Sequence, residues 1–151
     1  MKPDWDTIEM LLEKPCYIVD YLPKQVPEQS GGQFFAVENY LLNEYRTFGL
    51  DRRFAAVLLK LMCYYETIME WEGFHKPSPE KVLCAVRELM ENHSGTLHLL
   101  FPEKDAMAVV EWDSLSMGIY GPDEEMQELL EEIAGSEGLF FRRSPWGEDK
   151  A

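Results

Sequence analysis

The chain has 151 residues and a formal net charge of −14 at pH 7, from 28 acidic and 14 basic side chains. A hydrophobic content of 46 % is ordinary for a globular protein, so the composition argues against intrinsic disorder and favours a packed core. The charge argues against binding to nucleic acid or to an anionic membrane, because both are themselves negative. At this length we expect one domain over residues 1–151.

The chain begins with a short predicted helix and a short predicted strand. Asp6 and Glu9 form a capping-box pattern that predicts a helix over residues 6–13. β-Branched and aromatic residues then predict a strand over 16–22. We expect an irregular path over 23–33, which contains two prolines and two glycines.

Apolar side chains recur at helical spacing through the middle of the chain. The pattern predicts helices over residues 34–45, 52–72 and 79–92. Asp51 is placed to cap the second of these helices, and Ser78 followed by Pro79 is a strong N-cap and first-turn pair for the third. The second helix is the longest and has apolar residues on more than one face, so we expect it at the centre of the fold.

The periodicity changes to that of strands after residue 95. We expect strands over residues 96–101, 106–112, 115–120 and 138–142, with a helix between the last two that begins at 121–125. The third of these strands alternates apolar residues with Ser116, Gly118 and Tyr120, which predicts one apolar and one mixed face. Together the elements predict an α+β fold. In it, a mainly helical N-terminal part packs on a mostly antiparallel sheet formed largely by the C-terminal part, and about 144–151 form a frayed tail.

Ten acidic residues and one lysine lie within residues 103–132, which therefore hold nine of the fourteen net negative charges. We interpret this stretch as a candidate docking surface for a basic protein partner. The residues assigned to it are Glu124, Glu125, Glu128, Glu131 and Glu132 on the predicted helix, with Glu111 and Asp113 at a predicted turn. The alternative is a solvated helix face, since acids without basic partners one turn away repel one another only weakly.

The 23–33 segment is the second candidate site. Ser30, Gly31 and Gly32 precede a predicted helix, but the spacing of a phosphate-binding loop is absent and no basic residue follows closely. With Gln33, these residues are assigned to the rim of an alternative pocket for a small molecule or a substrate. The other interpretation of the segment is a plain connection.

The sequence predicts no cofactor and no metal site. The three histidines do not have the spacing of a metal motif, so we expect surface or hydrogen-bonded side chains. Cys16, Cys63 and Cys84 lie in apolar surroundings and are expected to be buried free thiols. Because no nucleophile motif is present, we expect a protein without enzymatic activity.

Two further features bear on location and assembly. The N-terminal sequence has no signal-peptide pattern and no stretch approaches ~18 apolar residues, so we expect a cytoplasmic protein without a membrane span. Residues 140–143 and Trp146 form a small basic and aromatic spot. We interpret this spot either as a contact between copies of the chain or as charged protection of an edge strand.

These observations name no reaction. The leading hypothesis is a non-enzymatic interaction module that binds a basic protein through an acidic surface. Small inhibitors such as immunity proteins against basic toxins have a comparable charge, but no motif supports that comparison. The alternatives are a small-molecule-binding or enzymatic domain with its site near 23–33, and a structural homo-oligomer.

Overall fold

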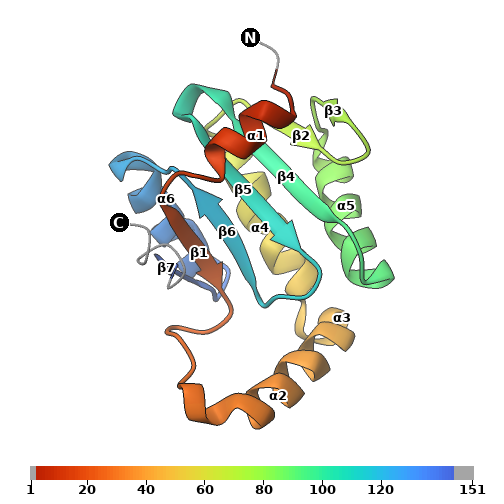
Figure 1. The fold of residues 1–151 in the computed structure, drawn as a ribbon. Helices are drawn as coiled ribbons and strands as arrows, with labels where there is room; N and C mark the ends of the chain where they lie inside the picture. The colour runs from red at the N-terminus through yellow and green to blue at the C-terminus, as the bar shows by residue number, and fades with distance from the viewer. Residues whose placement is uncertain (1–2, 145–151) are drawn as a thin grey trace.

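The computed structural model describes residues 3–144 of the chain, with the backbone alone at Ser30 and Gly31 (Figure 1). These residues form six α-helices and one antiparallel sheet of seven strands, in the order β3-β2-β4-β5-β6-β1-β7. The predicted α+β class, with a helical N-terminal part on a largely C-terminal sheet, is confirmed. The predicted frayed tail over about 144–151 is wrong at Ser144, which is buried and donates its amide hydrogen to the Cys16 carbonyl at 3.1 Å. The rest of that prediction, with Trp146, lies outside the described residues.

The bounds of the elements follow. The strands are β1 (Cys16–Asp20), β2 (Ile68–Glu70), β3 (Phe74–His75), β4 (Thr96–Phe101), β5 (Ala106–Glu111), β6 (Ser116–Tyr120) and β7 (Phe140–Arg143). The helices are α1 (Trp5–Leu11), α2 (Gly31–Asn43), α3 (Tyr45–Phe48), α4 (Leu50–Met62), α5 (Pro79–Asn92) and α6 (Glu124–Ser136). Short 3-10 turns cover η1 (Glu28–Ser30) and η2 (Pro102–Lys104).

Helix starts follow the capping chemistry of the sequence, with two corrections. The Ser78 hydroxyl accepts a hydrogen bond from the Lys81 amide at 3.3 Å, which confirms the predicted N-cap of α5. Helix α1 is capped by Asp4, and the prediction of a cap at Asp6 is wrong, because Asp4 forms a reciprocal capping box with Thr7. The prediction that Asp51 caps α4 is also wrong, since the helix begins at Leu50 after Gly49 in the left-handed conformation.

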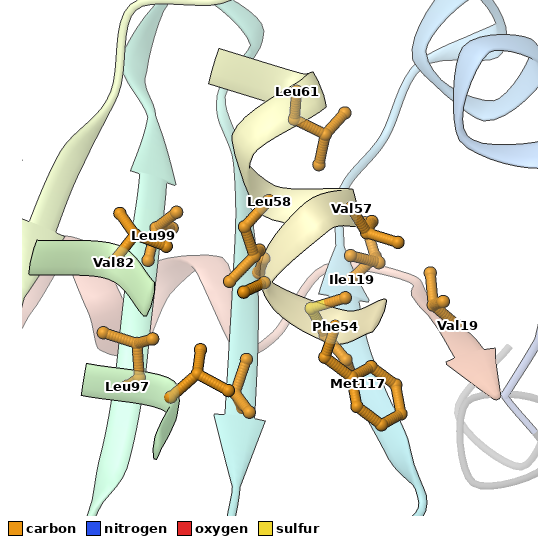
Figure 2. Packing of buried hydrophobic residues seen from close by; sticks show 14 of the residues in the cluster. Val19, Phe54, Val57, Leu58, Leu61, Val82, Leu97, Leu99, Met117 and Ile119 are labelled. Carbon is orange, nitrogen blue, oxygen red and sulfur yellow. The ribbon is translucent and has the colours of Figure 1, made fainter. Parts of the chain in front are cut away.

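Helices α4, α5 and α6 lie on one face of the sheet, called here the back face, and α1 lies on the opposite front face (Figure 1). The back-face core is shown in Figure 2. Strand side chains including Val19, Leu97, Leu99, Met117 and Ile119 meet helix side chains including Phe54, Val57, Leu58, Leu61 and Val82. All ten are nearly or fully buried, so this layer is the main hydrophobic core.

The front face is covered only over part of its width. Ile8 and Leu11 of α1 pack against Leu100, Met107 and Val109, so β4 and β5 are buried on both faces. On β6 the burial alternates, with Met117 and Ile119 buried on the back and Ser116 and Gly118 half-buried on the front, and Ile18 on the front of β1 is also half-buried. The front of β1 and β6 is therefore an accessible sheet surface.

The predicted helix over 52–72 is too long. Helix α4 ends at Met62, and the chain then forms the β2–β3 hairpin, which the sequence prediction missed. Tyr65 and Met69 continue the helical spacing by coincidence. Tyr65 lies in the loop after α4 and Met69 lies in β2, and both side chains are buried in the core. The cysteines are free, but the predicted burial is wrong, because Cys63 and Cys84 are exposed and Cys16 is half-buried.

Leu58 offers a direct test of the back-face core. Its side chain is fully buried between α4 and the sheet, so Leu58→Ala is expected to lower the free energy of unfolding by about 2–5 kcal/mol. Met10→Ala on α1 is the matched control, because Met10 is half exposed, and surface substitutions usually change stability by less than ~0.5 kcal/mol. Urea unfolding followed by circular dichroism measures both. Equal effects of the two substitutions would contradict this packing.

Candidate functional site

The front face of β1, β6 and β7 forms the floor of a groove. Residues that face each other across antiparallel strands share a face, and Ile18 is opposite both Gly118 and Arg142. Asp20 lies two residues beyond Ile18 and opposite Ser116, so it belongs to the same surface. This arrangement places one acid and one base on a floor of otherwise small or apolar residues.

The wall of the groove comes from the segment that follows β1 and from α2. Together with the floor they enclose a cavity of about 410 Å³. The wall residues are Leu22, Gln25, Val26, Pro27, Glu28, Phe34, Phe35 and Glu38, and Ser114 and Leu115 close the far side. The lining is mainly apolar with a few polar groups, which is the usual character of a ligand site, and its volume lies within the range of such sites.

Of the predicted pocket rim, Gly32 and Gln33 are not among the described residues that line the cavity, and Ser30 and Gly31 are described by their backbone alone. Ser30 ends η1, and Gly31, Gly32 and Gln33 form the first turn of α2 instead of a loop. Gly32 and Gln33 are exposed. The residues that line the cavity lie on either side of this turn, from Leu22 to Glu28 and from Phe34 to Glu38.

Two of the charges in the groove neutralise each other. Asp20 is 6 % exposed, accepts a hydrogen bond from the Leu22 amide at 3.2 Å, and forms an ion pair with the guanidinium of Arg142. The pair is partly buried, so removing either partner would leave an uncompensated charge. The Arg142 Nε is buried and, within the described part of the chain, has no hydrogen-bond partner.

Glu38 is the half-buried charge in the groove that has no basic partner among the described residues, whereas Glu28, which also lines the cavity, is exposed to solvent. No basic side chain among residues 3–144 pairs with it in the hydrogen bonds and ion pairs of the structure. Partial burial raises the pKa of the Glu38 carboxyl above its usual 4.5, and the nearby carboxylates of Asp113 and Asp20 raise it further. An ionised Glu38 is therefore held beside other negative charges in a partly dry site.

Helix α2, which carries Glu38, is unusually apolar for an exposed helix. Phe35, Val37 and Tyr40 are 64 %, 49 % and 57 % exposed, and Glu38 is the single charged residue among its thirteen. Figure 1 shows α2 extending beyond the end of the sheet, away from the layered body. A solvated surface helix normally carries charged residues on its outer face.

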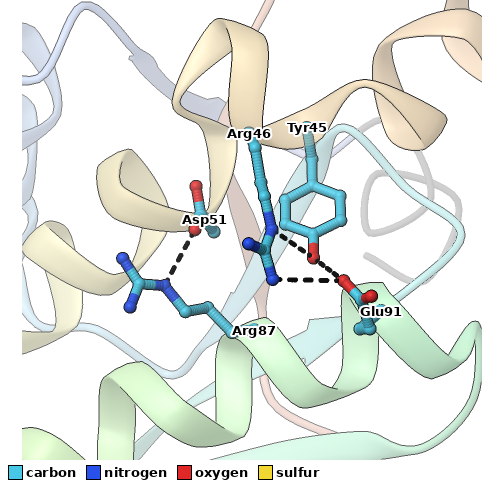
Figure 3. Close-up of polar contacts among 5 residues, drawn as sticks. All are labelled: Tyr45, Arg46, Asp51, Arg87 and Glu91. Carbon is cyan, nitrogen blue, oxygen red and sulfur yellow. Dashed lines mark hydrogen bonds and ion pairs between the residues drawn. The ribbon is translucent and has the colours of Figure 1, made fainter.

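Polar contacts tie α3 and the start of α4, which follow α2 in the chain, to α5 (Figure 3). The Tyr45 hydroxyl donates to Glu91 of α5, and the Arg46 Nε donates to the Tyr45 oxygen at 3.2 Å. The Arg87 guanidinium pairs with the buried Asp51 at 3.0 Å. The hydrogen bond from Tyr45, followed by the charge of Arg46, lowers the pKa of the Glu91 carboxyl. These contacts hold the α3–α4 junction on α5.

The acids assigned to a docking surface lie in two separate places. The α6 residues Glu124, Glu125, Glu128, Glu131 and Glu132 are all exposed. Lys104 pairs with Asp123 and Glu125 at 3.1 and 3.0 Å, so the start of the helix is partly neutralised, and these acids raise the Lys104 pKa. Glu111 and Asp113 lie at the β5–β6 turn, at the opposite end of β6 from the start of α6 (Figure 1). The turn therefore belongs to the groove region, since Asp113 acts on Glu38.

A second buried polar pair lies away from the groove, under α1. His98 Nδ1 lies 3.0 Å from Glu70 Oε1, and the Trp5 ring contacts the His98 ring edge-on. Within the described part of the chain, no group of three or more His, Cys, Asp and Glu side chains is placed to hold a metal ion. No described helix has the length and apolar character needed to cross a membrane.

Comparison of the chain with protein-family models, with curated proteins and with solved structures gives no match. A pocket beside the 23–33 segment was one of the alternatives drawn from the sequence, but sequence reasoning did not single out Asp20, Glu38 or Arg142 for it. Two weak signals were present: Asp20 is the single charge in an apolar strand, and Glu38 is the single charge in an apolar helix.

Tyr45→Phe tests the contact between α3 and α5. The lowered pKa of Glu91 means that the contact stabilises the fold above pH 4.5, the unfolded value, and that this stabilisation is lost as the pH falls through the lower folded value. We expect Tyr45→Phe to lower the thermal midpoint by a few degrees at pH 7 and by less at pH 3. Tyr64→Phe, at an exposed tyrosine, is the control. A difference that does not change with pH would contradict the role of Glu91.

Glu38→Gln is expected to stabilise the protein slightly. A raised pKa means that ionised Glu38 opposes folding, an effect absent below pH 4.5 and fully present above the folded value. The thermal midpoint of Glu38→Gln should therefore exceed that of the native chain at pH 7 and equal it at pH 3.5. Glu128→Gln removes the same charge from the exposed face of α6 and should give a smaller gain at pH 7. Equal gains would show that net charge alone, and not the groove, is responsible.

Proposed function

We propose that this protein is a non-enzymatic interaction module that binds a basic, partly apolar segment of a partner protein in the groove between α2 and the open sheet face. The observation that carries the proposal is an exposed apolar helix beside an apolar cavity with excess negative charge. The same groove supports the alternative of a small-molecule site, because its volume of about 410 Å³ suits a small ligand.

A partner that buries the exposed apolar side chains of α2 would gain free energy from their removal from water. Phe35 at the cavity, and Val37 and Tyr40 elsewhere on the helix, leave apolar side chains exposed to water, and exposed apolar surface can mark an interaction site in a folded protein. Burying one large apolar side chain contributes about 1.5–3 kcal/mol relative to leaving it exposed. Aromatic residues at the centre of an interface commonly provide most of its affinity.

Charge selects the kind of partner. The cavity is lined by three carboxylates (Asp20, Glu28 and Glu38) and one guanidinium (Arg142), and Asp113 adds a further negative charge near by. A second copy of the chain would bring its own charge of −14 to the contact. Electrostatic complementarity therefore favours a cationic protein over a homo-oligomer, and it raises the rate of encounter.

The α6 acids have a supporting place in this proposal. They surround the protein with a negative field that attracts a basic partner at a distance, while the groove makes the contact. The docking surface on α6 itself, a cytoplasmic location and the structural homo-oligomer stay predictions from the sequence.

Selection of binding peptides from a library of random linear peptides tests the proposal. We expect the native chain to enrich peptides that combine lysine or arginine with aromatic or aliphatic residues. Glu38→Gln/Asp113→Asn should weaken binding of the enriched peptides by about tenfold or more, because two unpaired charges are lost at the contact. Glu128→Gln/Glu132→Gln removes the same charge from α6 and should change the affinity much less.

The apolar part of the contact has its own variant. Phe35→Ala/Tyr40→Ala truncates exposed side chains only, and alanine suits a helix, so α2 should stay folded by circular dichroism. Peptide binding should again fall by about tenfold or more. Failure to enrich basic peptides, or enrichment that depends on α6 and is indifferent to α2 and Glu38, would overturn the groove as the docking site.

A further inference from the structure

The charged groups of the groove divide into a paired Asp20 and Arg142, an exposed Glu28 and a half-buried Glu38. Asp20 is occupied by Arg142 and by the Leu22 amide, so neither member of that ion pair is free to change partners without leaving a buried charge. Glu38 faces the same cavity from α2, and no described basic side chain pairs with it. Glu28 also lines the cavity but is exposed, where water solvates its charge, so Glu38 is the half-buried carboxylate for which a ligand would provide the counter-charge.

We infer that Glu38 is the receptor for a single ammonium or guanidinium group carried on an apolar stem, and that the stem lies in the cavity against Ile18, Phe34 and Leu115. This inference rests on the proposed function, in which the cation is a lysine or arginine side chain of the partner. Beyond that function, the inference names the chemical group that is bound, the residue that binds it and the part of the cavity that holds its apolar stem.

The surroundings of Glu38 explain why the ligand would be a cation. Asp113 and Asp20 repel an ionised Glu38, and partial burial withholds the water that would screen the charge. A bound cation removes this repulsion without further rearrangement. A neutral ligand of the same shape gains the apolar contacts alone, and an anionic ligand adds to the repulsion.

The length of the groove explains why the cation would belong to a peptide. A second cavity of about 180 Å³ continues across the front face and shares Ile18, Ser114 and Ser116 with the first. Its floor includes Gly118, and it reaches Val109 and Glu111 on β5. The two cavities together cross β7, β1, β6 and β5, which at ~4.8 Å between strands is about 14 Å. A free amine would occupy only the end next to Glu38, whereas a chain would use the whole length.

A set of three ligands of equal shape tests the cation site on the full chain. The probes are 4-phenylbutylamine, 4-phenylbutanol and 4-phenylbutyrate, titrated by two-dimensional NMR. We expect the amine to bind about fivefold more tightly than the alcohol, as for a partly exposed ion pair, and the acid to bind most weakly. Glu38→Gln should abolish the preference for the amine and leave alcohol binding unchanged. Glu38→Asp should retain part of the preference, and Glu128→Gln all of it.

The pH dependence separates Glu38 from the general negative field. Because a bound cation favours the ionised carboxylate, the affinity for the amine should rise as the pH increases above 4.5 through the titration of Glu38 and then stay constant. The affinity for the alcohol should not change. A preference for the amine that persists in Glu38→Gln, or no preference in the native chain, would overturn the assignment of Glu38.

A further binding measurement, with a short peptide as the ligand, tests whether the cation belongs to a peptide or to a free amine. Acetyl-Leu-Lys-Phe-amide should bind more tightly than the amine, and Gly118→Val, which fills only the second cavity, should remove that advantage while leaving amine binding intact. A peptide no tighter than the amine would point to a free organic cation and overturn the peptide assignment. If amine and alcohol bind equally while Phe35→Ala/Tyr40→Ala still abolishes selected peptides, the Glu38 receptor fails and the proposed function stands.

Discussion

An antiparallel sheet has two faces, and the packing of this protein covers them unequally. Helices α4, α5 and α6 bury the whole back face, whereas α1 buries the front only over β4 and β5. The front of β1 and β6 consequently carries Ser116 and Gly118 where the back carries Met117 and Ile119. The small residues are tolerated because no layer has to pack there. The accessible floor, its depth and its position beside α2 all follow from this one asymmetry.

Local patterns in the sequence predicted the elements better than their assembly. The start of α5 at Ser78–Pro79 was predicted from the N-cap preference of serine, and the structure confirms it. The alternating burial of β6 was predicted because successive side chains of a strand point to opposite faces of the sheet, and it too appears in the structure. The end of α4 was missed because Tyr65 and Met69 keep a helical spacing while belonging to other elements. Their aromatic and β-branched neighbours, Tyr64 and Thr67 to Ile68, were the competing signal for a strand.

The charged residues of the groove were beyond prediction for a different reason. Asp20, Glu38 and Arg142 come from β1, α2 and β7, and Asp20 and Arg142 are 122 positions apart in the chain. They meet because β1 is inserted between β6 and β7, which no local pattern specifies. The acids of α6 were conspicuous in the sequence because several lie close together in one short segment, whereas the groove depends on single charges in apolar elements. Such isolated charges are the more informative signal, since an apolar strand or helix tolerates one only where a partner or a function accounts for it.

Two kinds of acidic surface thus have different physical roles. The α6 carboxylates are exposed and screened, so their effect on a partner extends over about a Debye length, near 8 Å at physiological salt, and falls as salt is added. Glu38 lies in an apolar cavity beside Asp20 and Asp113, where screening by solvent is weaker. The α6 field would therefore govern how fast a basic partner arrives, and the groove how long it stays. An acid that opposes folding where it lies, on a helix that exposes its apolar side chains, is hard to explain by stability. Its position in the groove fits the proposed contact, which a basic partner would complete.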